Sequence, residues 1–140
     1  MKLSNRSGFT LLEVIIVIII IGVLASLALP RFFSTVEYSR GTEAMQAITT
    51  IRQSMERCYL MRSAYTGCNA FTALDIENPN TTPNSHFTYT LVTAANTYTI
   101  AATRNTRDAG VTSSSISLTY NATAATPITR AGTGAFSAVQ

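Results

Sequence analysis

Charge is scarce in this 140-residue chain, since 10 basic and 7 acidic residues make up only 12% of it, against about 25% in an ordinary soluble domain. It has no tryptophan, one histidine and two cysteines, which leaves little material for a structural zinc site. At 46% hydrophobic with a formal net charge of +3, the composition argues against a disordered chain and against one saturated with nucleic acid. The length fits one ordinary domain, or a smaller one with an appendage.

The few charges are spread unevenly along the chain. The N-terminal block carries Lys2 and Arg6, and the next block carries Glu13 alone. Eight charges follow in a third block, and six that cancel lie in the last and longest one. The blocks and their net charges are 1–8 (+2), 9–30 (−1), 31–62 (+2) and 63–140 (0). We therefore expect each block to form a segment of different structure.

A long apolar run follows the basic N-terminus. Val14 to Pro30 are 17 residues without a charge. The segment from Phe9 to Pro30, which includes Glu13, has 22 residues, close to the ~20 residues that cross a bilayer as a helix. The run is apolar on every side, and the remaining ~110 residues are too few to bury it. We therefore expect residues 9–30 to span a membrane, with residues 1–8 in the cytoplasm because of their positive charge.

A cleaved secretory signal peptide is the alternative to a membrane span. Residues 25–28, Ala-Ser-Leu-Ala, mimic the small-residue site at which a signal peptidase cuts. Charged and apolar residues continue in helical register beyond Pro30, however, and this favours one long helix over the start of a mature protein.

Glu13 is the anomaly of the apolar run. A carboxylate inside a membrane helix costs roughly 2.5–3.5 kcal/mol on insertion scales, so it needs a partner. Because no basic residue lies at helical spacing within the run, we expect the partner to come from elsewhere. Another chain, or an amine created by processing, would provide it.

The sequence Gly8-Phe9-Thr10-Leu11-Leu12-Glu13, with basic residues before it and an apolar run after it, resembles the processing site of type IV prepilins. The resemblance continues to Leu29-Pro30-Arg31-Phe32. It implies that a membrane aspartyl peptidase cuts after Gly8 on the cytoplasmic side and N-methylates Phe9. Met1–Gly8 is then a leader peptide, and Glu13 pairs with the N-terminal amine of a neighbouring subunit. A freed amine at Phe9 is the cation that the precursor lacks.

Residues 31–62 predict the amphipathic continuation of the same helix. Small and apolar side chains recur at three- and four-residue steps, with charges largely between them, which is the spacing of one helical face. The helix should run from about Phe9 to about Arg62, bent or locally melted at Pro30, which lacks a backbone donor. In type IV pilins the segment around this proline can lose helicity in the filament, so the resemblance implies a part for Pro30 in assembly. A simple kink of the helix at the membrane boundary is the alternative.

Residues 63–140 predict an antiparallel sheet after a loop. They hold 17 threonines, and apolar and polar residues alternate in three runs near 87–92, 97–102 and 115–120, the signal of half-buried strands. The link Thr93–Asn96 is short enough for a hairpin, and a further strand falls near 128–130 or 135–139. The predicted fold is α+β: a long N-terminal membrane-spanning helix packed on a small antiparallel sheet, as the resemblance to type IV pilins also implies.

Cys58 and Cys68 lie at the end of the helix and inside the loop of residues 63–86. With that region outside the cytoplasm, we expect a disulfide, worth roughly 2–4 kcal/mol, that pins the loop to the helix. Two free buried thiols are the alternative.

Other chemistry finds little support, and we predict neither an enzyme nor a cofactor or metal site. His86 has no acid or cysteine at catalytic spacing and is expected at the surface. Asn80 and Asn121 match the N-glycosylation pattern, as chance allows in a Thr-rich chain. The aromatic residues of the helix are expected to serve packing rather than electron conduction. A basic stripe on the sheet for nucleic acid is the remaining alternative; its members would be Arg104, Arg107 and Arg130.

Three functions follow. The first is a structural subunit of a type IV pilus, for adhesion, motility or DNA uptake, which sits in the inner membrane before assembly and in an extracellular filament afterwards. Its partners are other pilins, the prepilin peptidase and methyltransferase, the inner-membrane assembly platform and membrane lipid. The second is a pseudopilin of a type II secretion system, in which clustered acids typically hold calcium. The acidic residues after Met55 are scattered along this sequence, although Asp75 and Glu77 are close together. They are Glu56, Asp75, Glu77 and Asp108. The third is a DNA-binding minor pilin at a pilus tip.

Overall fold

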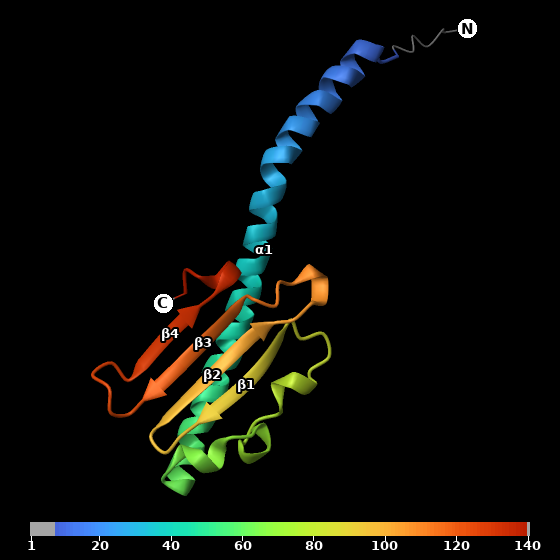
Figure 1. Ribbon diagram of the computed structural model, residues 1–140. Coiled ribbons are helices and arrows are strands. Elements are labelled where there is room, and N and C mark those ends of the chain that lie inside the picture. Colours follow the sequence, from blue (N-terminus) through green and yellow to red (C-terminus); the bar gives the residue numbers. More distant parts are fainter. Residues whose placement is uncertain (1–7, 140) are drawn as a thin grey trace, which may run out of the picture. The chain divides into compact units, whose positions relative to one another are not determined.

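A computed structural model describes residues 8–139 of the chain (Figure 1). One long helix, α1, runs over Leu11–Arg62, and four strands follow it. Their bounds are β1 Phe87–Thr93, β2 Thr97–Arg104, β3 Ser115–Asn121 and β4 Ile128–Gly132. The chain divides into two units, residues 1–36 and residues 37–140. The predicted α+β class is confirmed.

The described part of the first unit is the apolar half of α1. The helix starts at Leu11 rather than at Phe9 and continues without interruption through Pro30, so the predicted local melting at this proline is not seen in the isolated chain. By length and composition α1 holds a span able to cross a membrane, and none of that span is buried within the protein. This fits anchoring in a membrane before assembly.

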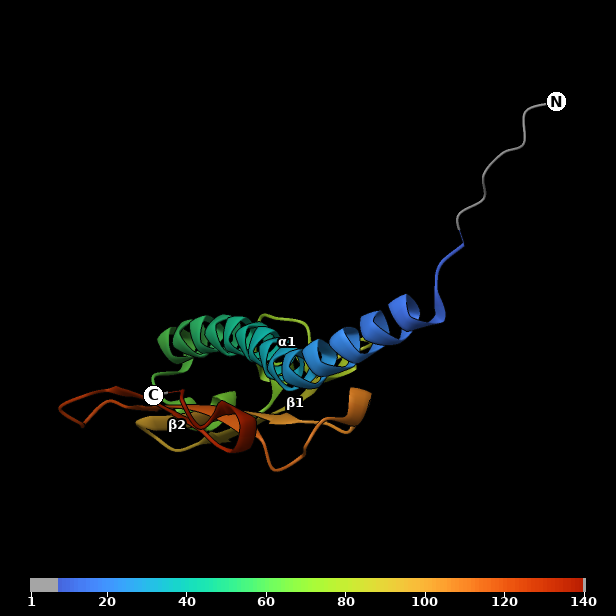
Figure 2. The same ribbon diagram turned by 90° about the horizontal axis from the view of Figure 1, so that it is seen from above.

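The second unit, which we call the headpiece, is a helix packed on a sheet. The four strands form an antiparallel meander in the order β1-β2-β3-β4, and the second half of α1 lies across one face of it (Figure 2). The strand registers determine which side chains share a face of the sheet. Phe87 stands opposite Arg104 in the β1–β2 pair, and Thr97 stands opposite Asn121 in the β2–β3 pair. Large apolar side chains therefore face the helix, and threonine and serine face away from it.

The core of the headpiece lies between helix and sheet. The buried helical residues fall on the predicted face and include Ala44, Ile48, Ile51, Met55 and Cys58. They pack against the inner side chains of the first three strands. The fourth strand is β4, as one of our two predictions had it. The other was wrong, because the segment near 135–139 begins with a short turn at Gly134–Phe136 that buries the Phe136 ring against Phe87, with 5.7 Å between ring centroids.

The outer edge of β1 is covered by the loop before it. The amide of Asn80 pairs with the backbone of Tyr89, accepting from its N–H at 2.7 Å and donating to its C=O at 2.9 Å. A side chain thus completes the ladder as a further strand would. Because the Asn80 amide is used in this way, the position is unsuited to carry a glycan. The Asn121 Oδ1 instead accepts from the backbone and hydroxyl of Thr123 in the β3–β4 turn.

Candidate functional site

The predicted processing site lies at the start of the described chain. Gly8, Phe9 and Thr10 precede the helix in backbone without regular structure, and all three are exposed. The Phe9 side chain is 85% exposed. The predicted leader, with Lys2 and Arg6, lies outside the described residues except for Gly8. The bond between Gly8 and Phe9 is thus exposed and lies directly before the helix.

Glu13 makes hydrogen bonds to Thr10 in its own segment. Its Oε2 accepts from the Thr10 N–H at 3.0 Å and from the Thr10 hydroxyl at 2.9 Å, and its own N–H donates to Thr10 Oγ1 at 3.3 Å. These reciprocal contacts are a capping box, for which Thr-x-x-Glu before an apolar run is the sequence signature. Our prediction concerned a cationic partner for Glu13, and these hydrogen bonds to the uncharged Thr10 do not supply one. Its negative charge still has no cation near it among the described residues.

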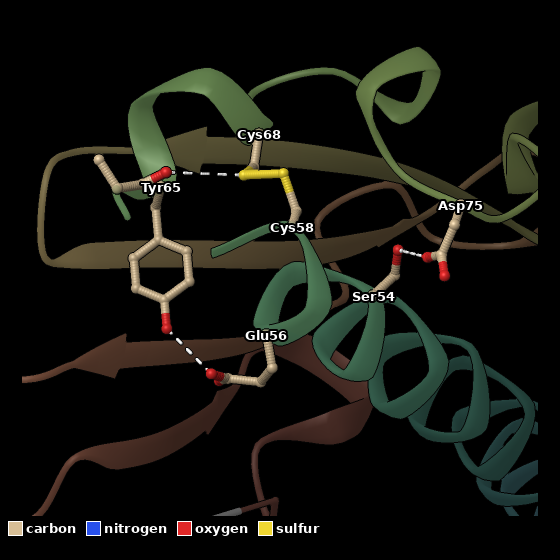
Figure 3. Close-up of a disulfide and its surroundings, with 7 residues drawn as sticks. Ser54, Glu56, Cys58, Tyr65, Cys68 and Asp75 are labelled. Carbon is tan, nitrogen blue, oxygen red and sulfur yellow. Dashed lines mark hydrogen bonds between the residues drawn. A yellow bond between two sulfur atoms is a disulfide. The ribbon is translucent and has the colours of Figure 1, made fainter. Parts of the chain in front are cut away.

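The end of α1 is tied to the loop by the predicted disulfide. Cys58 and Cys68 are bonded, with 6.2 Å between their Cα atoms (Figure 3). On the other side of the helix end, Glu56 accepts from the hydroxyls of Tyr65 at 3.0 Å and Tyr98 at 2.9 Å. Burial, and then the bond to Glu56, raise the pKa of both phenols above the usual range, so they stay protonated and donate.

Asp75 fastens the same loop at a second point. Its carboxylate accepts from Arg57 Nε at 2.5 Å and Nη2 at 2.9 Å, and from the Ser54 hydroxyl. The bond from Arg57, and then that from Ser54, lower the pKa of Asp75 to about 2. Of the four acids weighed for a calcium site, Asp75 is thus taken by Arg57, and Glu56 by two tyrosines.

We expect the contribution of Asp75 to stability to depend on pH. Because the folded pKa is depressed, ionised Asp75 stabilises the fold above its ordinary pKa of about 4, and that stabilisation is lost as pH falls from about 4 to about 2. Asp75→Asn should therefore melt at a lower temperature than the parent at pH 7, and the difference should vanish near pH 2. Thermal unfolding followed by circular dichroism between pH 2 and 7 measures it. A difference unchanged across that range would contradict this role, with Glu77→Gln as the matched control.

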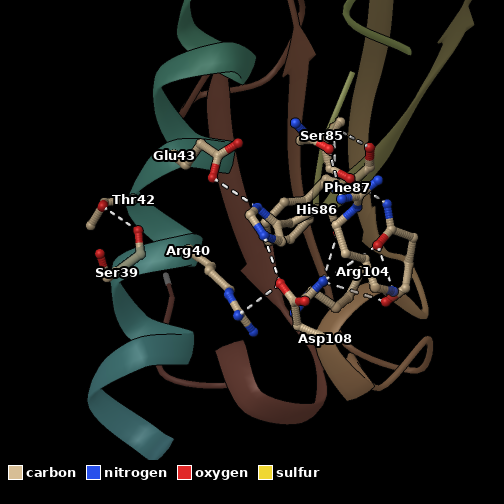
Figure 4. A network of polar contacts seen from close by, with 12 residues as sticks. Ser39, Arg40, Thr42, Glu43, Ser85, His86, Phe87, Arg104 and Asp108 are labelled. Atoms are coloured by element: carbon tan, nitrogen blue, oxygen red, sulfur yellow. Dashed lines mark hydrogen bonds and ion pairs between the residues drawn. The ribbon is translucent and has the colours of Figure 1, made fainter. Parts of the chain in front are cut away.

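Near the other end of the sheet lies a cluster of charges that we call the charge cluster (Figure 4). Its members are Glu37, Arg40, Glu43, His86, Arg104 and Asp108. At its centre Arg104 is only 1% exposed and donates to the two oxygens of Glu37, from Nε at 3.1 Å and Nη2 at 3.2 Å. This bond, more than the one from Arg40, holds the pKa of Glu37 below its usual value.

The charge cluster corrects two predictions. Arg104 faces the core and is covered, so it takes no part in a surface stripe. His86 was expected at the surface without an acid partner, but its Nε2 lies 3.1 Å from Asp108 Oδ2 and its Nδ1 lies 3.4 Å from Glu43 Oε2. The second contact is an ion-pair distance without hydrogen-bond geometry. These partners are 22 and 43 residues away in sequence, so local spacing did not reveal them.

Four arginines of the headpiece have no carboxylate within 4.0 Å among the described residues, and we call them the free arginines: Arg52, Arg62, Arg107 and Arg130. Arg107 donates instead to Asn84 Oδ1 at 2.9 Å. Arg130 stands opposite Leu118 in the register, hence on the helix side of the sheet. There it is exposed, because all but the last residue of β4 are exposed.

Arg52 and Arg130 lie on the same side of the headpiece. Arg52, on α1, is close enough to Tyr98 to oppose the rise of its phenol pKa. Tyr98 pairs with Tyr120, and Tyr120 pairs with Ile128 of β4, two residues before Arg130. The half-buried Tyr120 ring, stacked on Tyr98 at 5.1 Å, is thus diagonal to Arg130. The opposite face of the sheet carries no charged residue, so basic contacts gather on the helix side.

Comparison with known proteins agrees with these features. Residues 3–29 match the prokaryotic N-terminal methylation motif, and residues 30–117 match the family "Type IV minor pilin ComP, DNA uptake sequence receptor". The type II secretion system core protein G of Aeromonas hydrophila is 35% identical over 65 residues, 46% of each chain. The type IV major fimbrial protein FimA of Dichelobacter nodosus is 37% identical over 57 residues, 41% of this chain and 36% of its own.

The core protein G of Escherichia coli matches over a longer stretch, 34% identical over 80 residues, 57% of this chain and 55% of its own. The matched segments thus span about half the length of these relatives or less. No solved structure is significantly similar to the chain. Since the family model covers well over half of its residues, the chain belongs to the type IV minor pilin ComP family.

Proposed function

We propose that this protein is a DNA-binding subunit of a type IV pilus. The observation that carries the proposal is the match of residues 30–117 to a family described as a DNA uptake sequence receptor. The matched residues include α1 from Pro30, strands β1 and β2, and the start of β3. The methylation motif over residues 3–29 supports the processing and assembly that a pilus subunit needs. The proposal has two parts, entry into a filament and contact with DNA.

Entry into the filament begins with cleavage. A prepilin peptidase in the inner membrane cuts after Gly8, and Phe9 becomes the methylated N-terminus. The exposed, non-helical backbone at these residues fits a protease, which needs an extended substrate. Before assembly the apolar half of α1 holds the protein in the inner membrane with its N-terminus in the cytoplasm. The assembly platform then moves it into an extracellular filament.

In the filament Glu13 pairs with the amine that cleavage creates on a neighbouring Phe9. In the isolated chain the carboxylate only caps its own helix, and that contact supplies hydrogen bonds without a counter-charge. Surrounded by apolar helices, an unpaired carboxylate and an unpaired amine are both costly. One axial stagger of the subunits pairs them, so this charge pair sets the register of the filament, with Pro30 as the point at which α1 adapts.

Contact with DNA falls to the helix side of the headpiece. Within residues 8–139 no carboxylate pairs with Arg52 or Arg130, so both are available to phosphates, the main source of affinity for duplex DNA. Tyr120 is diagonal to Arg130 on the same face of the sheet, and it is half-buried. Arg62 and Arg107 extend the basic surface toward the two ends of the sheet. The uncharged threonine face of the sheet offers phosphates no cation.

We expect salt-dependent binding of duplex DNA by the full mature protein in detergent micelles. Each arginine that contacts a phosphate contributes about −0.9 to the slope of log K against log salt concentration, so Arg52→Gln and Arg130→Gln should each make the slope shallower by about 1. Fluorescence anisotropy of a labelled duplex between 50 and 300 mM NaCl measures this.

Arg57→Gln is the matched control for this experiment. Its guanidinium is already paired with Asp75, so the salt slope should stay as in the parent. Absence of binding at 50 mM salt, or an equal effect of all three substitutions, would argue against DNA contact through the free arginines.

A pseudopilin of a type II secretion system is the second candidate, because two core protein G relatives are 35% and 34% identical to this chain over 65 and 80 residues. The match of the ComP family model, which continues through β2 and into β3, favours the pilin. A strain lacking the gene separates them: loss of DNA uptake supports the pilin, and loss of protein secretion with normal DNA uptake supports the pseudopilin.

A further inference from the structure

A groove runs between α1 and the loop before β1, and we call it the loop groove. Two adjoining cavities of about 180 and 350 Å³ form it, and they share Ala47 and Pro79 in their walls. Ile51 and Ile76 line the larger cavity, and Tyr89 lines the smaller. The surface is therefore apolar inside, of the kind that takes up a partner's side chains.

The groove is preformed rather than soft. The loop that makes one wall is held by the Cys58–Cys68 disulfide, by Asp75 on Arg57, and by the Asn80 amide on the backbone of Tyr89. Since these ties fix the wall before any partner arrives, little ordering of the loop is needed on binding.

A carboxylate lines each of the two cavities, and among the residues that the structure describes no basic side chain lines either of them. Glu43 borders the smaller cavity and Glu77 the larger, and the Glu43 side chain is 52% exposed. An apolar lining between two negative groups selects a segment that combines apolar side chains with a cation.

This chain carries such a segment directly after its apolar run. Phe32 and Phe33 are 63% and 64% exposed, and their rings pack edge to face at 6.1 Å as one aromatic knob. Arg31 precedes them and has no carboxylate within 4.0 Å among the described residues. The knob continues the apolar surface of α1 along which filament subunits are expected to pack.

We propose that the loop groove receives Arg31, Phe32 and Phe33 of a second copy of this chain in the filament. The two rings enter the two cavities, and the guanidinium of Arg31 faces Glu43 or Glu77. The inference rests on the proposed assembly of the chain into a filament, but not on DNA binding.

Cysteine cross-linking tests the contact with the knob unaltered and with Thr82 as the one changed residue of the groove lining. Ser34→Cys next to the knob and Thr82→Cys on the rim of the groove are produced together in one cell, and sheared filaments are mildly oxidised. The native cysteines are already paired. We expect disulfide-linked dimers from filaments and none from the protein in detergent. Adding Phe32→Ala and Phe33→Ala to the Ser34→Cys chain should lower the dimer yield roughly tenfold.

Two further pairs serve as controls. Ser34→Cys with Thr90→Cys, on the exposed face of the sheet away from the helix, should not cross-link. Met61→Cys with Thr82→Cys tests the exposed segment Leu60–Arg62 as the occupant. Cross-linking of this last pair in place of the first, or filaments without cross-links of the first pair, would overturn the proposed contact while leaving the filament intact. Failure of the unaltered chain to form filaments would overturn the proposed function as well.

Discussion

Replacing Glu37 by alanine should lower the free energy of unfolding of the headpiece by about 3 kcal/mol, the largest loss we expect from a single polar residue. Glu37 is the counter-charge of Arg104, whose side chain is fully covered. Without Glu37 the Arg104 guanidinium keeps its hydrogen bonds to the carbonyl oxygen of His86 and to the carbonyl and side-chain oxygens of Asn105. These acceptors carry no charge, and a buried unpaired charge typically costs ~3–5 kcal/mol. We expect the lower end of this range of free energies because the Glu37 side chain is itself 26% exposed.

Chemical denaturation of the full mature protein in micelles, followed by near-ultraviolet circular dichroism of the headpiece tyrosines, measures this loss. Glu77→Ala is the matched control on the loop groove, and a surface change of this kind should stay within about 0.5 kcal/mol. The double variant Glu37→Met with Arg104→Met should lose less than Glu37→Ala, since it leaves no charge unpaired. If Glu37→Ala were as mild as Glu77→Ala, the ion pair would not stabilise the headpiece.

Replacing Glu13 by alanine should abolish filaments while the protein still accumulates in the membrane. Each subunit that joins would bury an N-terminal amine without its carboxylate. A penalty of ~3–5 kcal/mol for an unpaired charge corresponds to a roughly 100-fold or greater loss in the equilibrium for adding a subunit. Counting sheared filaments by electron microscopy, with the membrane-bound protein measured by immunoblot, gives the result.

Thr10→Val separates assembly from helix capping. It removes the hydroxyl through which Thr10 and Glu13 cap the helix, at a cost of about 1 kcal/mol, but it leaves the Glu13 charge in place. We expect Thr10→Val to assemble and Glu13→Ala not to. Normal filament yield from Glu13→Ala would show that the charge pair does not direct assembly, and equal defects in both variants would assign the effect to the cap.

The elements with a regular period were the predictable part of the fold. Three- and four-residue steps from residue 44 onward placed the buried helical face. Alternation around Tyr89, Ile100 and Leu118 placed the starts of three strands correctly and their ends to within two residues. The fourth strand was harder, because Ile128–Gly132 is an edge strand whose side chains are almost all exposed, so its sequence shows little alternation.

In the candidate site too, the features that depend on neighbouring residues in the sequence were predictable, and those that depend on distant residues were not. Gly8, Phe9 and Glu13 form a local motif. The capping box was also readable from the sequence, since Thr10 and Glu13 stand three residues apart before an apolar run. The burial of Arg104 was not, because its partner Glu37 is 67 residues away and only the packing of β2 on α1 brings them together. Strand register likewise places Arg130 on the helix side of the sheet, and the sequence alone does not determine that register.

The N-terminal mass of this protein taken from sheared filaments tests the central claim, that it is a processed pilus subunit, most directly. Peptide mass spectrometry should find the chain in the filaments, beginning at Phe9 with one methyl group on its amine. A chain that begins at Met1 or at any residue other than Phe9, or one that is absent from filaments while present in the membrane, would contradict it.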